Sequence, residues 1–401
     1  MKTVGIIAEY NPFHNGHLHH IKKARELSGA DYAAVVMSGD FTERGTPAVF
    51  SKALRTKLAL LGGADLVFEL PVFGALAPAQ DFAMAGVSAL HASGIVDTLC
   101  FGSECGDIGS LSRQQKELSE EPPEVSEKIQ EFLRQGMSWP RARAEAYSSF
   151  STVPLSPNDI LGVEYLGALK RLSSPIVPFT IPRKDPGYHS LSRSGSFASA
   201  SAIRNALLLG DQDFLDPVLP DFFFPCLKES GEEPLWPDDF SFLLNEKILS
   251  ASIEDLEQTA GMPKDMAASL FRDRLTFRSV TEITAAQKTR QYTYARTSRS
   301  LANVMLSISR EDSLAFKAAK SAPWLRVLGF KKSAAPLLAK LNEKAAVPVI
   351  TKTAAAPSLL SKETCALFEK HLKSAELRRL TAQLKTGRTE KNEFTRPLTI
   401  L

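Results

Sequence analysis

Two histidines near the N-terminus, His14 and His17, have the residue types and spacing of a phosphate-handling site. They flank Gly16, after an apolar run, Thr3–Glu9, and before a helical pattern, Leu18–Leu27. The start of a helix offers unpaired N–H groups and the positive end of a dipole to phosphate. Gly16 allows a nucleotide to approach the backbone closely, and the imidazoles can donate hydrogen bonds to an α-phosphate under attack. The alternative is a pair of ordinary surface histidines in a loop.

A second cluster of candidate side chains lies where another helix is predicted to begin. Ser199 and Ser201 supply hydroxyls, whose common role at such a position is helix capping, and Arg204 follows three residues later. These groups can also hold the β- and γ-phosphates, with the guanidinium steadying a departing pyrophosphate. Arg183 and Lys184 follow a predicted strand and add positive charge near the same edge of the sheet.

The elements that must position these side chains alternate along the first half of the chain. Five apolar runs lack a clear polar–apolar alternation, which is typical of buried parallel strands; they are Thr3–Glu9, Tyr32–Met37, Asp65–Leu70, Thr98–Gly102 and Ile176–Ile181. Helical patterns separate them, and this order predicts an α/β fold, a Rossmann-like doubly wound parallel sheet. Ligands in such sheets bind beyond the carboxyl ends of the strands. After Gly210 few strand patterns remain, so we expect a mainly α-helical C-terminal region.

Gly102 and Asn158 are two further candidates at this edge. Gly102 ends the fourth predicted strand, where a base or ribose can lie against the backbone or where the strand simply turns. Asn158 follows Pro157 at the start of a helical pattern, where it is either the N-cap of the helix or a nucleotide contact. The residues alone leave both alternatives open.

The net charge of +3 conceals a strong division along the chain. Residues 1–210 carry a net charge of −1, residues 211–265 carry −11 together with several prolines, and residues 266–401 carry +15. We therefore predict a nucleotide-binding catalytic domain at 1–210, an acidic connector at 211–265 and a basic, mainly helical RNA-binding region at 266–401. The alternative for the last segment is a basic helical surface in solvent.

Basic residues interleaved with tyrosines mark the part of this region with the strongest RNA-binding pattern. Arginine and lysine pair with phosphates, and tyrosine rings stack on unpaired bases. The candidates are Arg278, Lys288, Arg290, Tyr292, Tyr294, Arg296 and Arg299.

Composition argues against several other classes of protein. The four cysteines are scattered without a CxxC pair, which argues against a zinc site and against a disulfide framework. No apolar stretch approaches the ~20 residues of a membrane span. The first residues lead directly into a strand without the layout of a signal peptide, so we expect a cytoplasmic protein. No group of residues predicts a protein-held metal.

These motifs together resemble a known family. The histidine motif and the segment Ser199–Arg204 resemble the HxGH nucleotidyltransferase superfamily, whose members attack the α-phosphate of a nucleotide triphosphate. Residues 4–17, 37–45, 101–104 and 156–162 narrow the resemblance to the bacterial tRNA(Met) cytidine acetate ligase family. Two positions depart from the pattern: Ala200 replaces a hydroxyl, and Asp40 replaces an expected Asn. The carboxylate of Asp40 would be unfavourable near the phosphates unless it faces away from them or holds Mg²⁺.

The resemblance implies a two-step, ATP-dependent ligase reaction. Acetate attacks the α-phosphate of ATP and releases pyrophosphate, and N4 of the wobble cytidine of elongator tRNA(Met) then takes the acetyl group from acetyl-adenylate. His14 and His17 would be the catalytic residues, and Mg²⁺ would accompany the nucleotide. No protein nucleophile is implied, because positioning and charge stabilisation supply the catalysis. The resemblance also implies no membrane and no protein partner.

The resemblance also assigns residues to the ATP site. Gly102, Asn158, Arg183 and Lys184 would surround the adenosine and ribose, and Ser199, Ser201 and Arg204 would hold the outgoing pyrophosphate. The rest of the expected cradle is Ile7, Ala8, Glu9, Tyr10, Asn11, Pro12, Phe13, His14, Asn15, Gly16, His17, Leu18, His19 and His20.

Two other functions remain open from the sequence. An adenylyl- or cytidylyltransferase for a small phosphorylated metabolite would share the whole first domain but would not need the +15 extension. A non-catalytic RNA-binding protein would retain only a decayed nucleotide site, and the intact histidine pair argues against such decay.

Overall fold

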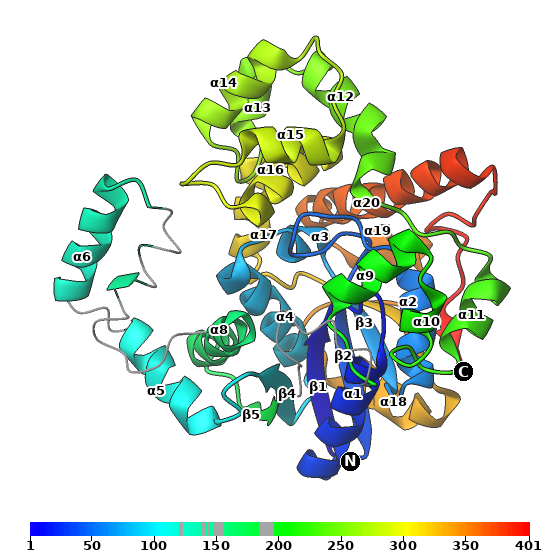
Figure 1. Cartoon of the computed structure of the whole chain (residues 1–401). Coiled ribbons are helices and arrows are strands. Elements are labelled where there is room, and N and C mark those ends of the chain that lie inside the picture. Colours follow the sequence, from blue (N-terminus) through cyan, green and yellow to red (C-terminus); the bar gives the residue numbers. More distant parts are fainter. Residues whose placement is uncertain (120–122, 138–141, 143–144, 147–155, 184–195) are drawn as a thin grey trace.

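A single mixed sheet forms the centre of the molecule (Figure 1). The computed structural model describes residues 1–119, 123–137, 142, 145–146, 156–183 and 196–401. Within them the strand order is β5-β4-β1-β2-β3-β6-β7, β8 pairs with β6, and every pair is parallel except β3–β6. The strands are β1 (Thr3–Ala8), β2 (Tyr32–Ser38), β3 (Leu66–Leu70), β4 (Thr98–Ser103), β5 (Val177–Pro182), β6 (Leu325–Phe330), β7 (Val349–Ile350) and β8 (Thr399–Ile400).

The predicted Rossmann-like α/β fold is confirmed, with β1 at the centre of its parallel part. Each of the first five strands begins and ends within about one residue of the predicted bounds. β1 pairs with β2 from Thr3 opposite Tyr32 to Ala8 opposite Met37, and with β4 on its other side. The loop that follows β1 therefore emerges between the carboxyl ends of β2 and β4, where this class of sheet binds ligands.

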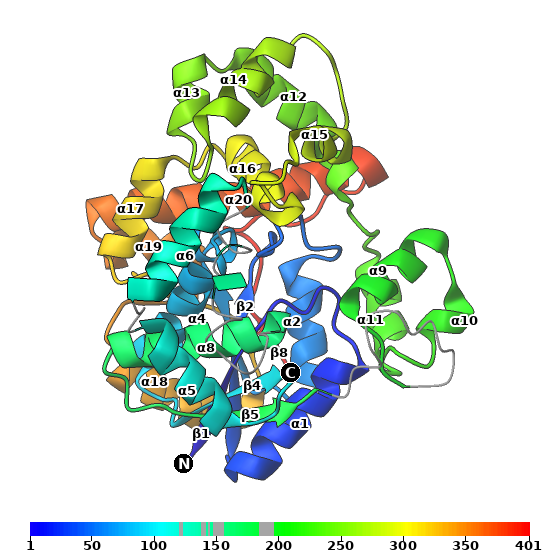
Figure 2. The same ribbon diagram turned by 60° about the vertical axis from the view of Figure 1, so that its left-hand side comes forward.

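Helices cover both faces of the sheet and extend beyond it (Figure 2). Among the described residues, none of them is both long and apolar enough to span a membrane. Short 3₁₀ turns cover Pro237–Phe240, Lys332–Ala334 and Thr353–Ala355. The α-helices are α1 (Asn15–Ser28), α2 (Lys52–Leu61), α3 (Val72–Ala75), α4 (Ala79–Ser93), α5 (Ile108–Ser119), α6 (Pro123–Arg134), α8 (Pro157–Arg171), α9 (Ala200–Leu209), α10 (Gln212–Leu215), α11 (Phe223–Ser230), α12 (Ser241–Ser250), α13 (Ile253–Gln258), α14 (Lys264–Asp273), α15 (Val280–Gln287), α16 (Tyr294–Leu306), α17 (Arg310–Ala318), α18 (Ala335–Lys344), α19 (Ala356–Leu359) and α20 (Lys362–Thr386).

The two faces of the sheet enter two separate cores. Neighbouring residues of a strand point to opposite faces, so Val35 packs with α1, α2 and α9–α11, whereas Val36 packs with α4, α8 and α20. Because both faces are covered, the first five strands are mainly apolar, as predicted from their lack of alternation, and Glu69 of β3 is a buried exception.

The C-terminal third contributes strands as well as helices. β6 pairs antiparallel with β3, and β7 and β8 pair with β6. One sheet therefore contains strands from residues 1–210 and from residues 266–401, the two segments predicted as separate domains. These strands escaped sequence analysis because β6 is a short apolar run among helical patterns and its partner is distant in sequence. Helices α12–α16 form a lobe to one side of the sheet (Figure 1).

Candidate functional site

His14 and His17 begin α1 as a reciprocal capping pair. His14 is the N-cap, and its Nδ1 accepts the N–H of Gly16 at 3.0 Å. Nδ1 of His17 accepts the N–H of His14 at 3.3 Å, and the two ring centroids lie 3.8 Å apart. This capping box satisfies backbone donors that a helix start leaves unpaired, and it fixes both rings at the end of β1.

Both imidazoles are neutral at physiological pH. Burial, followed by the charges of Arg183 and Arg204, lowers the pKa of His14 to about 3. Burial, followed by His14 and His20, holds the pKa of His17 well below its ordinary value. A neutral imidazole that accepts at Nδ1 carries its proton on Nε2. Each ring therefore keeps an Nε2–H donor, the kind of group that suits the oxygens of a phosphate whose charge grows during reaction.

Two glycines make room for side chains of the site. A Cβ at Gly16 would lie 2.8 Å from Cε1 of His14, and a Cβ at Gly102 would lie 3.2 Å from Cγ of Arg183. Sequence analysis expected both glycines to admit a nucleotide. The structure adds a second reason for each, because a larger residue would displace the histidine ring or crowd the arginine stem.

Ser199, Ser201 and Arg204 lie at the N-terminus of α9. Ser199 is the N-cap, and its Oγ accepts the N–H of Ala202 at 3.2 Å. Arg204 donates from Nη2 to Oγ of Ser201 at 3.0 Å and from Nη1 to the carbonyl of Asn11 at 2.8 Å. Asn11 lies in the turn between β1 and His14, so this arginine joins the two predicted clusters into one site.

Arg183 and Asn158 meet beyond the ends of β4 and β5. Arg183 donates from Nη1 to Oδ1 of Asn158 at 3.1 Å, and Asn158 donates to Oε1 of Glu104 at 2.6 Å. The N-cap of α8 is Ser156, so the capping alternative for Asn158 was wrong. Lys184 lies outside the described residues.

The remaining predicted cradle residues mainly build the histidine turn. Tyr10 and Phe13 are buried, and the ring of Tyr10 lies 4.8 Å from that of His17 between centroids. Oδ1 of Asn11 accepts the N–H of Val49 at 2.9 Å. Ile7 and Ala8 end β1, Glu9 and Pro12 lie in the turn, and Asn15, Leu18, His19 and His20 lie in the first turns of α1.

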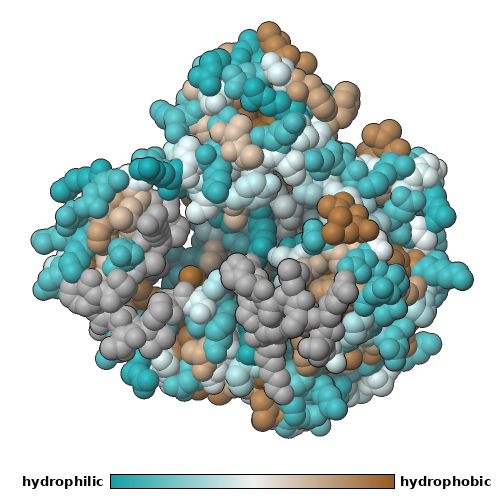
Figure 3. Space-filling model, in the orientation of Figure 1, coloured by the Kyte–Doolittle hydropathy of each residue, from teal (hydrophilic) through white to brown (hydrophobic). Residues whose placement is uncertain are grey.

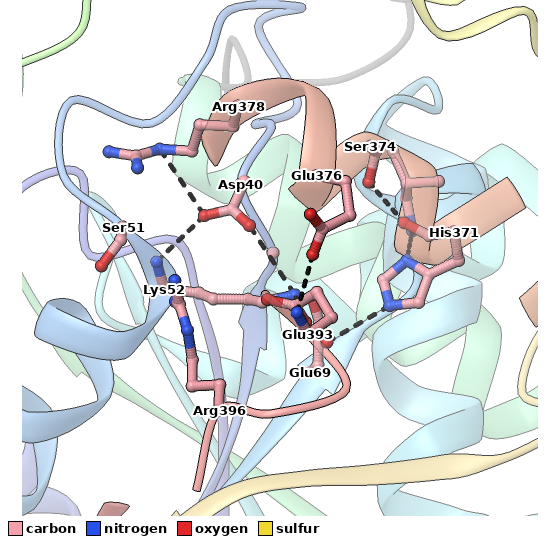
Figure 4. Close-up of polar contacts among 12 residues, drawn as sticks. Asp40, Ser51, Lys52, Glu69, His371, Ser374, Glu376, Arg378, Glu393 and Arg396 are labelled. Carbon is pink, nitrogen blue, oxygen red and sulfur yellow. Dashed lines mark hydrogen bonds and ion pairs between the residues drawn. The ribbon is translucent and has the colours of Figure 1, made fainter. Parts of the chain in front are cut away.

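Asp40 belongs to a buried charge cluster, shown in Figure 4. Its Oδ1 accepts the N–H of Lys52 at 3.0 Å, and Nε of Arg378 lies 3.6 Å away. Protein cations thus compensate this carboxylate within the fold. Among the described residues, no group of three His, Cys, Asp or Glu side chains is placed to hold a metal ion. The buried charge cluster consists of Asp40, Lys52, Glu69, Arg326, His371, Arg378 and Glu393.

The β2–α2 loop, residues 39–51, joins the end of β1 to α16. Oε1 of Glu9 accepts the N–H of Glu43 at 2.6 Å, and burial raises the pKa of that Glu9 carboxyl. On the other side, Arg299 pairs with Glu43 at 2.7 Å, and Ser298 donates to the carbonyl of Gly45 at 2.9 Å. The loop is therefore held from both the sheet and the helical lobe.

Arg44 is the residue of the site that sequence reasoning missed. Its Nη1 lies 3.4 Å from Oγ of Ser201. The available signal was its place within residues 37–45, one of the segments that carry the family resemblance.

The predicted RNA-binding residues differ in how far their side chains are exposed to solvent. Arg278 and Tyr292 are half-buried, and the guanidinium of Arg296 lies 4.8 Å from the ring centroid of Tyr292. Arg299 is largely buried in its ion pair, so its side chain holds the β2–α2 loop. RNA contact by these residues stays a prediction. The exposed members of the set are Lys288, Arg290, Tyr294 and Arg296.

A cavity of about 1420 Å³ lies between the sheet helices α4 and α8 and the helices α16 and α17. Phe73, Val163 and Phe316 contribute apolar walls, and Glu43 and Arg296 line it as charged groups. Figure 3 shows the surface hollowed between the sheet and the helical lobe. Because the N–H of Glu43 donates to the carboxyl of Glu9, this cavity borders the turn that follows β1.

Comparison with known proteins agrees with this geometry. The family model described as HIGH Nucleotidyl Transferase matches residues 1–393. The tRNA(Met) cytidine acetate ligase of Syntrophotalea carbinolica is 38% identical, covering 88% of this chain and 85% of its own length. That of Caldanaerobacter subterraneus subsp. tengcongensis is 34% identical, covering 99% of both chains. The crystal structure of Thermotoga maritima TmcAL bound with alpha-thio ATP matches with a TM-score of 0.89 at 29% identity, covering 100% of both chains.

Proposed function

This chain belongs to the tRNA(Met) cytidine acetate ligase family, and we propose that it uses ATP to acetylate N4 of the wobble cytidine of elongator tRNA(Met). The observation that carries the proposal is the pair of mutually capping imidazoles at the end of β1, linked through Arg204 to Ser201. ATP and tRNA are both cytoplasmic substrates, so we place the reaction in the cytoplasm.

The first step is adenylyl transfer to acetate. A carboxylate oxygen of acetate forms a bond to the α-phosphorus, the bond from that phosphorus to the bridging oxygen breaks, and pyrophosphate leaves. His14 and His17 donate their Nε2–H groups to the non-bridging oxygens of the α-phosphate, whose charge they stabilise. Ser201 and Arg204 hold the departing pyrophosphate, while Arg183 and Asn158 contact the nucleoside.

Mg²⁺ would accompany the triphosphate and would offset part of its negative charge. Asp40 is compensated by Lys52 and Arg378, so this carboxylate serves the fold. Within the described part of the chain, no group of three His, Cys, Asp or Glu side chains is placed to hold this cation.

The second step transfers the acetyl group to the tRNA. The cytidine amine nitrogen forms a bond to the acetyl carbon, the bond from that carbon to the AMP oxygen breaks, and the amine releases one proton. We assign the cavity beside Glu43 to the entering anticodon loop, with Arg296 on its wall. Unpaired bases suit an apolar cavity and their phosphates suit arginine.

Exchange of labelled pyrophosphate into ATP, with and without acetate, tests the first step. The wild type should exchange label only with acetate. His14→Ala and His17→Ala should each lose about 100-fold or more, since removing one such donor costs about 10²–10³ in rate. His91→Ala, on α4, is the control and should keep full exchange. Exchange that needs a phosphorylated metabolite, or that survives both histidine variants, would contradict the proposal.

A further inference from the structure

Arg44 and Arg204 converge on the hydroxyl of Ser201 at the start of α9. Arg44 approaches from the β2–α2 loop at 3.4 Å, and Arg204 approaches from within α9 at 3.0 Å. Ser201 is the second residue of α9, so both guanidinium groups lie beside the first turn of this ten-residue helix. That turn presents N–H groups and a positive dipole end, both of which attract anions.

The two guanidinium groups place two positive charges beside one neutral hydroxyl. Glu9 lies close enough to interact electrostatically with both Arg44 and Arg204. A pyrophosphate group carries several negative charges and matches the forked donors of two arginines. The two guanidinium groups beside one helix start therefore suit a multiply charged anion such as pyrophosphate.

The backbone on both sides of Arg44 is fixed while its side chain is exposed. Glu43 is held by Glu9 at 2.6 Å and by Arg299 at 2.7 Å, and Gly45 is held by Ser298 at 2.9 Å. Gly45 has φ +76°, and a Cβ there would collide with the backbone of α16, so the loop fits closely against that helix. The backbone of so fixed a loop loses little conformational entropy when its side chain binds a ligand.

We propose that Arg44 binds the β- and γ-phosphates of ATP and stays on pyrophosphate as it departs, opposite Arg204. This rests on the proposed adenylyl transfer to acetate. As the bond between the α-phosphorus and the bridging oxygen breaks, negative charge moves onto pyrophosphate, and Arg44 stabilises it there. The residue touches the leaving group and makes no covalent bond.

Binding of pyrophosphate and of AMP to the full chain, measured by titration calorimetry, tests the role of Arg44. Arg44→Ala should weaken pyrophosphate at least about tenfold, because charge-assisted hydrogen bonds are lost. It should leave AMP affinity unchanged, because AMP lacks the β- and γ-phosphates. Arg44→Lys keeps the charge without the fork and should fall between the wild type and Arg44→Ala. Arg272→Ala, an exposed arginine on α14, is the matched control and should bind both ligands normally.

Three outcomes would overturn the role of Arg44. They are unchanged pyrophosphate affinity in Arg44→Ala, equal losses for AMP and pyrophosphate, and full rescue by lysine. In the exchange assay Arg44→Ala should show a higher KM for ATP and a lower kcat. If Arg44 were merely structural, Arg44→Ala would lower protein stability and would weaken pyrophosphate and AMP binding alike. The binding experiment is also independent of the proposed reaction with acetate. If the wild type failed to exchange with acetate, the acetate assignment would fail, yet the pyrophosphate titration would still decide whether Arg44 binds this anion.

Discussion

At the scale of single residues, the site depends on charge states that the sequence does not display. The spacing of His14 and His17 predicted phosphate chemistry, but their neutrality follows from burial and from nearby arginines, which only the fold brings together. Arg44 and Arg299 show the same limit. In the sequence each is one basic residue among many, yet in the structure Arg44 contacts Ser201 and Arg299 is paired with Glu43. Long-range partners of this kind leave no local pattern in the sequence.

The low pKa of His14 predicts a pH dependence of stability. In the unfolded chain a histidine takes up a proton below about pH 6.5, whereas folded His14 stays neutral down to about pH 3. Between these values the unfolded state binds more protons, so stability is fully present above about pH 6.5 and falls as pH falls. The wild type should therefore lose about 2 kcal/mol more than His14→Gln between pH 7 and pH 4.5, from this one group. Urea unfolding at both pH values measures the difference, and parallel losses in the two proteins would show that folded His14 is already charged.

At the scale of elements, the β2–α2 loop connects the nucleotide side to the helical lobe. Sequence analysis found its residues as a family segment and separately found α16 as part of a basic region. It did not connect them, because the contacts of Glu43 and Gly45 reach Arg299 and Ser298 more than half the chain away. By contrast, the strands and helices of the first half followed from local apolar patterns, since each is bounded by ordinary turn and cap residues.

Gly45→Ala should damage this connection more than an ordinary glycine substitution does. Gly29 and Gly45 both have positive φ, but a Cβ at Gly29 meets nothing within 4 Å, whereas one at Gly45 meets the backbone of α16. Gly29→Ala should cost about 1–2 kcal/mol, the usual penalty for a left-handed residue. Gly45→Ala should cost more than this in urea unfolding and should also raise the KM for ATP, because the loop that carries Arg44 is displaced. Equal stability losses and an unchanged KM would show that the close approach to α16 is unimportant.

At the scale of the whole molecule, the two ends of the chain complete one sheet around the buried charge cluster. Lys52 from α2 lies 2.7 Å from Glu69 of β3 and 2.8 Å from Glu393 near the C-terminus. Arg326 of β6 contacts the same two carboxylates at 2.9 and 2.5 Å. Charge and composition suggested a division into an N-terminal and a C-terminal part, and they could not reveal this junction because formal charge counts treat buried and solvated groups alike.

Lys52→Met should therefore destabilise the molecule as a unit. The substitution leaves Asp40, Glu69 and Glu393 buried with one cation fewer, and breaking such a group typically costs about 3–5 kcal/mol. Lys57→Met is the matched control on the same helix, because Lys57 pairs at 2.7 Å with a mainly exposed Glu229 and should cost about 1 kcal/mol or less. Urea unfolding followed by far-UV circular dichroism reports on the whole chain. Tryptophan fluorescence, measured with Trp139 and Trp236 replaced by Phe in both proteins, reports on Trp324, which is buried beside His371. Both signals should move together to lower urea in Lys52→Met. If fluorescence changed first while circular dichroism kept its wild-type midpoint, the C-terminal elements would unfold separately and the cluster would not unite the two ends of the chain.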